Sequence, residues 1–155
     1  MAFTAKILTV SDSVSRGARE DLSTAAVAAV LEDHGFAVVT RMVVPDGMNP
    51  VREALTTFSS AFAGLVVTTG GTGFSPTDLT PEATTAVLER PAPGLAEAMR
   101  AVNPLGRLSR GVAGTIGACL VLNLPGSPQG AVESLEAVID VLEHALELLA
   151  GQRPH

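Results

Sequence analysis

The chain has 155 residues, 46% of them hydrophobic, and a formal net charge of −6. This length and composition predict a single domain, residues 1–155, that buries an aliphatic core. The acidic balance argues against nucleic acid as a general partner, since a phosphate backbone is bound by a basic surface. No apolar run has the length of a membrane span or the flanks of a signal peptide. With one cysteine, Cys119, and hence no disulfide framework, a reducing cytoplasmic setting is expected.

Strands and helices alternate through the first half of the chain. Two expected strands cover residues 5–10 and 37–44, and a third strand ends at residues 65–67. The expected helices cover residues 22–34 and a segment that begins at Asn49-Pro50. Apolar residues at helical spacing and a terminal Gly35 support the helices. The alternation is typical of a parallel sheet with right-handed crossovers, and therefore of an α/β fold.

Two polar loops follow strands of this predicted sheet. Ser11 and Asp12 begin the first loop, and Asp46 stands in the second, within Pro45-Asp46-Gly47. The carboxyl ends of parallel strands share one edge, where ligand crevices form. Ser11 and Asp12 fit either a solvated turn or a ligand-facing loop. Asp46 fits either a turn-forming residue or a metal ligand.

A glycine-rich loop, residues 68–78, follows the third strand. At its centre lies Thr69-Gly70-Gly71-Thr72-Gly73. Three glycines within four residues let the backbone approach a bound group and turn its N–H groups towards an anion. Asp78 could orient a polar substrate, or share a divalent cation such as Mg²⁺ with Asp46. A tight connection without a ligand is the alternative.

The chain continues with a helix and a proline-rich segment. Thr80 is expected to cap the helix, with Pro81 in its first turn. Prolines break residues 90–104 into short pieces. We expect this segment to cover an edge of the sheet or to meet another subunit.

The last third of the chain predicts a strand pair and a final helix. Residues 108–114 and 118–123 are expected to pair as strands joined at 114–117. Ser127 is expected to cap one long helix that runs from Pro128 to about Leu149. The Gly-Ser step before this helix suits a bound anion as well as a plain helix start.

Several common functional motifs are absent. The chain has no P-loop pattern, and Pro76 replaces the last glycine of the dinucleotide-binding pattern. The histidines have no metal-ligand spacing. A nucleotide would therefore have to bind through a different kind of loop.

In their order along the chain, the motifs resemble the molybdopterin-binding family of MogA and MoaB proteins. The resemblance rests on the glycine loop with Asp78, on Thr80-Pro81-Glu82-Ala83-Thr84, on Thr9-Val10-Ser11-Asp12-Ser13, on Pro45-Asp46, and on Asn123-Leu124-Pro125-Gly126-Ser127-Pro128. It covers nearly the whole chain. It implies a three-layer α/β sandwich, with a mostly parallel sheet and an antiparallel strand pair near the C-terminal part, that usually forms a homotrimer.

The resemblance also implies an activity in molybdenum cofactor biosynthesis. Family members bind molybdopterin and Mg-ATP and transfer AMP to the terminal phosphate of the pterin, releasing pyrophosphate. The implied catalytic and metal-binding residues are Asp46 and Asp78. The implied substrate-binding residues are Ser11, Asp12, Thr69, Gly70, Gly71, Thr72, Gly73, Pro125, Gly126 and Ser127. Other proteins of molybdenum cofactor biosynthesis are candidate partners.

The sequence departs from the family pattern at a few positions. Many relatives carry basic residues where this chain has Ile116, Ala118 and Gln129, and a glycine where it has Thr24. Arg16, Arg107 or Arg110 are the candidates to supply positive charge to a phosphate instead. Two alternatives to an adenylyltransferase stay open: a non-catalytic pterin-binding scaffold and a molybdate-insertion-type domain.

Overall fold

A six-stranded mixed sheet forms the centre of the computed structural model, which describes residues 3–153. Its strands are β1 (Thr4–Val10), β2 (Ala37–Val44), β3 (Gly64–Thr69), β4 (Arg90–Pro91), β5 (Ala113–Ile116) and β6 (Cys119–Leu124), in the order β2-β1-β3-β6-β5-β4. The first three strands and β6 are parallel, and β5 is antiparallel to both β6 and β4. The predicted sheet, mostly parallel with an antiparallel pair, is confirmed.

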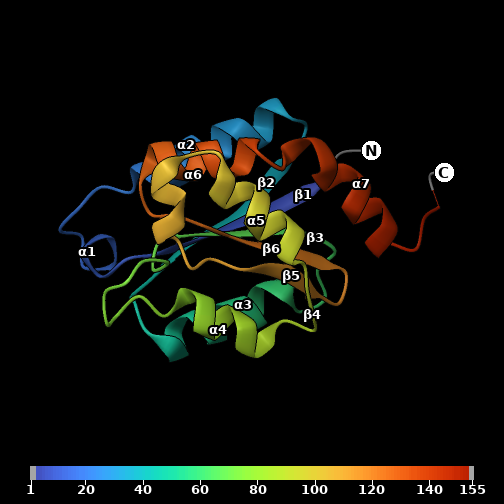
Figure 1. Cartoon of the computed structure of the whole chain (residues 1–155). Helices are drawn as coiled ribbons and strands as arrows, with labels where there is room; N and C mark the ends of the chain where they lie inside the picture. The colour runs from blue at the N-terminus through green and yellow to red at the C-terminus, as the bar shows by residue number, and fades with distance from the viewer. Residues whose placement is uncertain (1–2, 154–155) are drawn as a thin grey trace.

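Helices cover both faces of the sheet and complete a three-layer sandwich (Figure 1). They are α1 (Asp12–Ser15), α2 (Leu22–Asp33), α3 (Met48–Ser59), α4 (Thr80–Val87), α5 (Pro93–Ala101), the 3-10 helix η1 (Pro104–Leu108), α6 (Pro128–Glu136) and α7 (Ile139–Leu149). α2, α5, α6 and α7 cover one face, and α3 and α4 cover the other. Within residues 3–153, no helix is long and apolar enough to cross a membrane.

The core divides into two apolar layers, one on each face of the sheet. Every residue of β3 and β6 is buried, because these central strands are covered on both sides. Alternate side chains of β3 point to opposite faces, so Leu65 joins the layer under α2 and α6 while Val66 joins the layer under α3. Cys119 is buried in the second layer.

The predicted strand at 108–114 is wrong in its position. Pro104 opens η1, which runs to Leu108, and Arg110 then bonds through its N–H to the Thr72 carbonyl instead of joining the sheet. Pairing with β6 begins only at Ala113. The observed connection is also shorter than predicted, since Gly114 lies within β5 and the turn forms at Gly117, whose φ is +56°.

Several helix boundaries differ from the sequence prediction. The final helix ends at Glu136 and a new one begins at Ile139, although neither proline nor glycine stands between them; the break leaves Val138 buried in the core. α3 begins at Met48, so Asn49 lies inside it and bonds Arg52 instead of capping the helix. The first polar loop contains the short helix α1.

The proline-broken segment does cover a sheet edge, because Arg90–Pro91 forms the edge strand β4. Gly114 of β5 makes this pairing possible. A Cβ built at that glycine would lie 2.5 Å from the Arg90 carbonyl oxygen. The segment then continues as α5, which packs Ala96 and Met99 into the core.

Candidate functional site

Three loops with predicted site residues converge at the carboxyl edge of the sheet. β1, β3 and β6 are neighbours, with Thr9 beside Thr69 and Thr69 beside Leu124. The first polar loop, the glycine loop and the Pro-Gly-Ser turn therefore leave the sheet side by side. For the first polar loop and the glycine loop, this convergence was predicted from the alternation of strands and helices, and the structure confirms it. The place of the Pro-Gly-Ser turn beside them was not predicted and follows from the parallel pairing of β6 with β3.

Glycine backbones allow these loops to touch. Gly70 has a φ of +97°, and a Cβ built there would overlap the Val10 carbonyl oxygen. A Cβ built at Gly126 would lie 3.3 Å from the Cα of Gly70. The Gly126 carbonyl in turn accepts a hydrogen bond from the Ser23 hydroxyl of α2 at 2.6 Å. Side chains larger than hydrogen at Gly70 and Gly126 would push the loops apart.

Asp12 and Asp46 hold their two loops together through reciprocal hydrogen bonds. The Asp12 N–H donates to Asp46 Oδ2 at 3.1 Å, and the Asp46 N–H donates to Asp12 Oδ1 at 3.0 Å. Burial, followed by the negative charges of Asp12 and Asp78, raises the pKa of Asp46 above its ordinary value. The hydrogen bond from the Asp12 N–H lowers the pKa of Asp46 and so partly offsets this increase. Three carboxylates thus share one electrostatic neighbourhood.

This neighbourhood suits a hard divalent cation shared with a substrate. Its donors are carboxylate oxygens, the type that Mg²⁺ prefers. Burial and, to a smaller extent, repulsion from Asp12 and Asp78 raise the pKa of Asp46, and a positive charge would offset both effects. Residues 3–153 contain no group of three or more His, Cys, Asp or Glu side chains arranged as a protein-only metal site. Asp46 and Asp78 fit instead a Mg²⁺ ion held by one or two carboxylates, water and phosphate oxygens.

The pH dependence of stability should reveal the strain at Asp46. A raised pKa means that ionising Asp46 destabilises the fold; this effect is absent below the unfolded value of 3.8 and grows as pH rises through the folded pKa. Asp46→Asn should therefore raise Tm near neutral pH, by only about 1–2 °C because the side chain is partly exposed to screening solvent. The gain should vanish below about pH 4. Melting curves at both pH values would check this, and a variant that melts lower than wild type near neutral pH would contradict it.

Arg110 holds the glycine loop in place. Its Nε donates to the Gly73 carbonyl at 2.8 Å and its Nη2 to the Asp78 carbonyl at 2.6 Å, while Nη1 pairs with Glu82 at 2.6 Å. Asp78 Oδ2 also accepts the Ser75 N–H at 3.0 Å, so the loop is braced from both sides. Arg110 was a candidate for binding a phosphate, but these three partners commit it to the protein.

A cavity of about 700 Å³ opens beside the glycine loop. From the predicted site it is lined by Gly71, Thr72, Gly73, Asp78, Pro125, Gly126 and Ser127. The structure places Ser11, Asp12, Asp46, Thr69 and Gly70 outside this lining. Gly71 adjoins both regions, since a Cβ built there would lie 3.3 Å from Asp46 Oδ1. The cavity is large enough for a cofactor-sized ligand.

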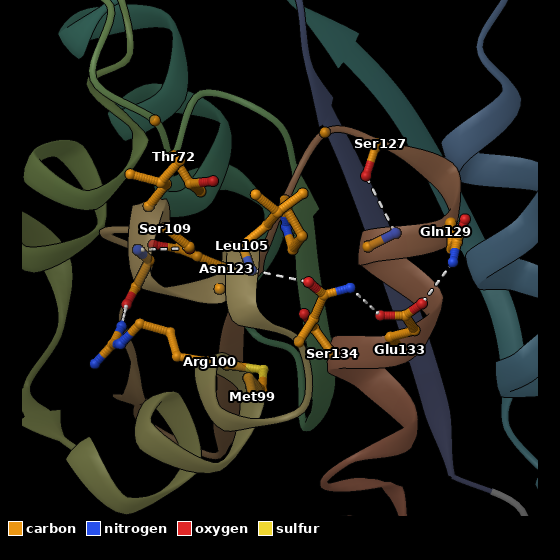
Figure 2. A pocket seen from close by; sticks show the side chains of 18 of the residues that line it. Thr72, Met99, Arg100, Leu105, Ser109, Asn123, Ser127, Gln129, Glu133 and Ser134 are labelled. Carbon is orange, nitrogen blue, oxygen red and sulfur yellow. Dashed lines mark hydrogen bonds between the residues drawn. The ribbon is translucent and has the colours of Figure 1, made fainter.

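Two opposite walls of the cavity combine predicted residues with Arg100, Leu105, Ser109 and Glu133, which sequence reasoning missed. Figure 2 shows Thr72, Ser109 and Arg100 on one side and Ser127, Gln129 and Glu133 of the α6 segment on the other, with Leu105 of η1 between them. The only signal for this wall was the weakly charged, proline-broken segment that became α5 and η1. Its contribution depends on how that segment packs against β5 and α6.

Among the described residues, Arg100 is the only basic one that lines the cavity. Its Nη1 donates to the Gly111 carbonyl at 2.6 Å. Neither Arg16 nor Arg107, two of the predicted phosphate-binding candidates, is among the lining residues. Ile116 and Ala118 lie at the β5–β6 turn, and Ile116 pairs with Cys119, which is level with the start of β3. These two departures therefore fall at the end of the sheet opposite the cavity.

Polar side chains are buried directly beneath the loops. The Asn123 side chain accepts the Val112 N–H and donates to the Thr68 and Thr84 hydroxyls, each within 3.1 Å. Thr80, predicted to cap α4, lies inside the helix, and among the described residues its hydroxyl and that of Thr69 have no hydrogen-bond partner. The floor of the site therefore carries unpaired polar atoms as well as a satisfied network.

The chain is similar to proteins of one functional group. Residues 6–144 match the family model described as "Probable molybdopterin binding domain". A protein named molybdopterin adenylyltransferase from Helicobacter pylori is 36% identical over 152 residues, covering 94% of this chain and 86% of that protein. The crystal structure of the molybdopterin biosynthesis enzyme MoaB from Thermus thermophilus superimposes with a TM-score of 0.92 at 48% identity, covering 97% of this chain and 98% of that one.

A longer relative contains the same unit. The molybdenum cofactor biosynthesis bifunctional protein of Chlorobaculum tepidum is 34% identical over 151 residues, which covers 94% of this chain and 48% of that protein. The chain therefore corresponds to about half of that protein.

Proposed function

This chain belongs to the family of molybdopterin-binding domains, and we propose that it is a molybdopterin adenylyltransferase of molybdenum cofactor biosynthesis. The observation that carries the proposal is the junction at Gly71. On one side of this glycine lies the cavity, with Asp78 in its wall, and on the other lies Asp46. A site that joins a cofactor-sized cavity to paired carboxylates can hold a pterin and a metal-bound nucleotide together.

The proposed substrates are molybdopterin and ATP. Their reacting groups would meet at the glycine loop, where the N–H groups of Gly71 and Gly73 can bind phosphate oxygens, while the Gly70 N–H is already bonded to the Leu124 carbonyl. A phosphate oxygen of the pterin attacks the α-phosphorus of ATP, and the bond to pyrophosphate breaks. Mg²⁺, held by Asp46 or Asp78, would offset charge on the triphosphate. The described residues would bind, align and exclude water, and the reaction needs no covalent enzyme intermediate.

The residues around the loop have supporting roles in this proposal. Arg110 fixes the carbonyls of Gly73 and Asp78, so the Asp78 carboxylate is presented at a defined place in the cavity wall. The reciprocal bonds between Asp12 and Asp46 do the same for the second carboxylate. A preorganised site of this kind needs little rearrangement when charge develops in the transition state.

Omitting each reactant in turn tests the proposal. Pyrophosphate release, followed with a coupled enzyme assay, should require the protein, molybdopterin, ATP and a divalent cation together. It should disappear with an ATP analogue whose α–β bridge cannot be cleaved. Equal release without pterin would identify a hydrolase. Binding of pterin with no release under any condition would favour the scaffold, the alternative suggested by the absence of basic residues at Ile116, Ala118 and Gln129.

We also propose that the protein is a homotrimer of the cytoplasm that works with other proteins of molybdenum cofactor biosynthesis. The relative in which this unit is about half of a bifunctional protein supports such a partnership. Exposed apolar side chains outside the cavity lining, such as Leu22, Val102 and Val141, are available for subunit contacts. Sedimentation equilibrium at micromolar concentration should give three times the chain mass of 15.8 kDa. A single species at the monomer mass would refute the trimer.

A further inference from the structure

Among the described residues, Glu133 is the only carboxylate besides Asp78 that lines the cavity. It projects from the second turn of α6. Asn103 Nδ2 donates to its Oε2 at 2.9 Å, and Gln129 Nε2 donates to its Oε1 at 2.8 Å. These amides hold the pKa of Glu133 below its usual value, so the group is charged at neutral pH. The proposed mechanism does not use the charge of Glu133.

A negative charge in this wall restricts how a phosphorylated ligand can lie. Glu133 would repel a phosphate, whereas the glycine loop at Gly71 and Gly73 offers backbone N–H groups. Figure 2 shows Glu133 on the α6 side of the cavity, across from Thr72 of the glycine loop. The part of a phosphorylated ligand that reaches Glu133 should therefore carry hydrogen-bond donors and no negative charge.

Resting on the proposed function, we propose that Glu133 recognises the 2-amino-4-oxopyrimidine edge of the pterin. This edge presents the 2-amino group and the N3–H as neighbouring donors, which match the two oxygens of one carboxylate. An ionised carboxylate has about four acceptor positions, of which Asn103 and Gln129 use two. Glu133 thus distinguishes a pterin from fused heterocycles that lack this pair of donors.

The surroundings of Glu133 support this orientation. Asn103 uses its other amide atom, Oδ1, to cap η1 through the Leu105 N–H at 2.9 Å, so the carboxylate is tied to the wall opposite α6. Met99 and Leu105 line the space between, and Leu105 is 73% exposed. A flat ring bound against Glu133 would cover this apolar surface, and the methionine sulfur suits contact with an aromatic ring.

A comparison of two small pteridines tests the inference. Pterin carries the 2-amino group, whereas lumazine carries a carbonyl there, so its edge presents one acceptor and one donor. Titrating the intrinsic fluorescence of each compound with wild-type protein should show pterin binding roughly 10- to 100-fold more tightly, the range expected for losing a hydrogen bond to a charged group. Wild-type protein that binds both equally, or neither, overturns the inference.

Glu133→Gln should change the preference and not simply weaken binding. A carboxamide offers one acceptor and one donor, which complement lumazine, so the ratio of the two dissociation constants should fall to about one or invert. Glu136→Gln removes the same charge from an exposed position on α6 and should keep the wild-type ratio. A Glu133→Gln protein that keeps the wild-type ratio refutes the role of Glu133. The pyrophosphate assay is scored separately: an intact pteridine preference without pyrophosphate release would refute the transferase and leave this inference standing.

Discussion

Asp78→Asn is expected to lower the rate of pyrophosphate release at least ~100-fold, the scale typical of losing one key electrostatic group. The substitution removes the negative charge while keeping an oxygen that can accept the Ser75 N–H now bound to Oδ2. Arg110 holds the loop through the Asp78 carbonyl, which the substitution leaves unchanged. Stability should therefore stay within about 0.5 kcal/mol of wild type, as for ordinary surface changes.

Turnover and thermal melting would be measured on the same preparation of the Asp78→Asn protein. Asp33→Asn provides the matched control, because Asp33 is an exposed residue at the end of α2, outside the cavity lining. The control should keep wild-type turnover. Normal turnover in the Asp78 variant would remove Asp78 from the mechanism. Loss of folding would instead show that its carboxylate serves the structure.

The sequence could predict the site where strand order alone determines the geometry. Ser11, Asp46 and Gly70 follow strands that are parallel, and parallel strands carry their loops to the same edge. Strand periodicity and glycine spacing are local signals, so they can be recognised in the sequence without knowledge of tertiary contacts. The same is true of Ser127, which caps α6 through the Gly130 N–H as predicted.

Interactions between distant segments could not be predicted in this way. Arg110 was one of three candidates for binding a phosphate, because a guanidinium pairs well with one. Its partners are mostly main-chain carbonyls, which every residue possesses and no sequence pattern marks. Glu133 was missed because a glutamate on an amphipathic helix has the same pattern whether it faces solvent or a cavity. Its position depends on the return of Asn103 over the sheet, 30 residues away in the chain.

The predictions of helix boundaries were wrong for a related reason. Thr80 before Pro81 has the pattern of a cap, yet Thr80 is buried beneath Gly71 and its hydroxyl bonds no helix N–H. The contact between the glycine loop and α4 outweighs the local preference for a capped start. The break between α6 and α7 likewise accompanies the burial of Val138, and no residue between the two helices is of a type that predicts a helix end.

Gly71→Ala is expected to abolish most of the activity, by at least ~100-fold, and to destabilise the fold. Gly71 has a φ of +67°, and a Cβ built there would overlap Thr80 Oγ1, a fully buried atom, and approach Asp46 Oδ1 at 3.3 Å. The alanine therefore adds overpacking, about 1–3 kcal/mol, to the strain of a left-handed backbone. Either response, a shifted loop or a shifted α4, would move the N–H groups that face the ligand.

Gly117→Ala separates these two effects. Gly117 has a similar φ, +56°, but a Cβ built there meets no atom within 4 Å. Its substitution should lower stability by about 1 kcal/mol, which corresponds to about 2–4 °C in Tm for a chain of this size, and should leave pyrophosphate release unchanged. The additional loss in Gly71→Ala measures the contact with Thr80. Equal melting temperatures for the two variants would show that the glycine loop shifts to accommodate the added methyl group at no measurable cost in stability.

Combining Gly71→Ala with Thr80→Ala completes the test. Thr80→Ala removes the overlapping oxygen, and among the described residues that oxygen has no hydrogen-bond partner to lose. The double variant should therefore recover the stability lost to overpacking and melt near Gly117→Ala, because two residues in contact are energetically coupled. Activity should stay low if the added methyl group itself holds the phosphates away from the loop amides. Recovery of full turnover along with stability would mean that catalysis requires only the correct position of the glycine loop. The absence of a side chain at Gly71 would then serve packing against Thr80 and not close approach of the ligand.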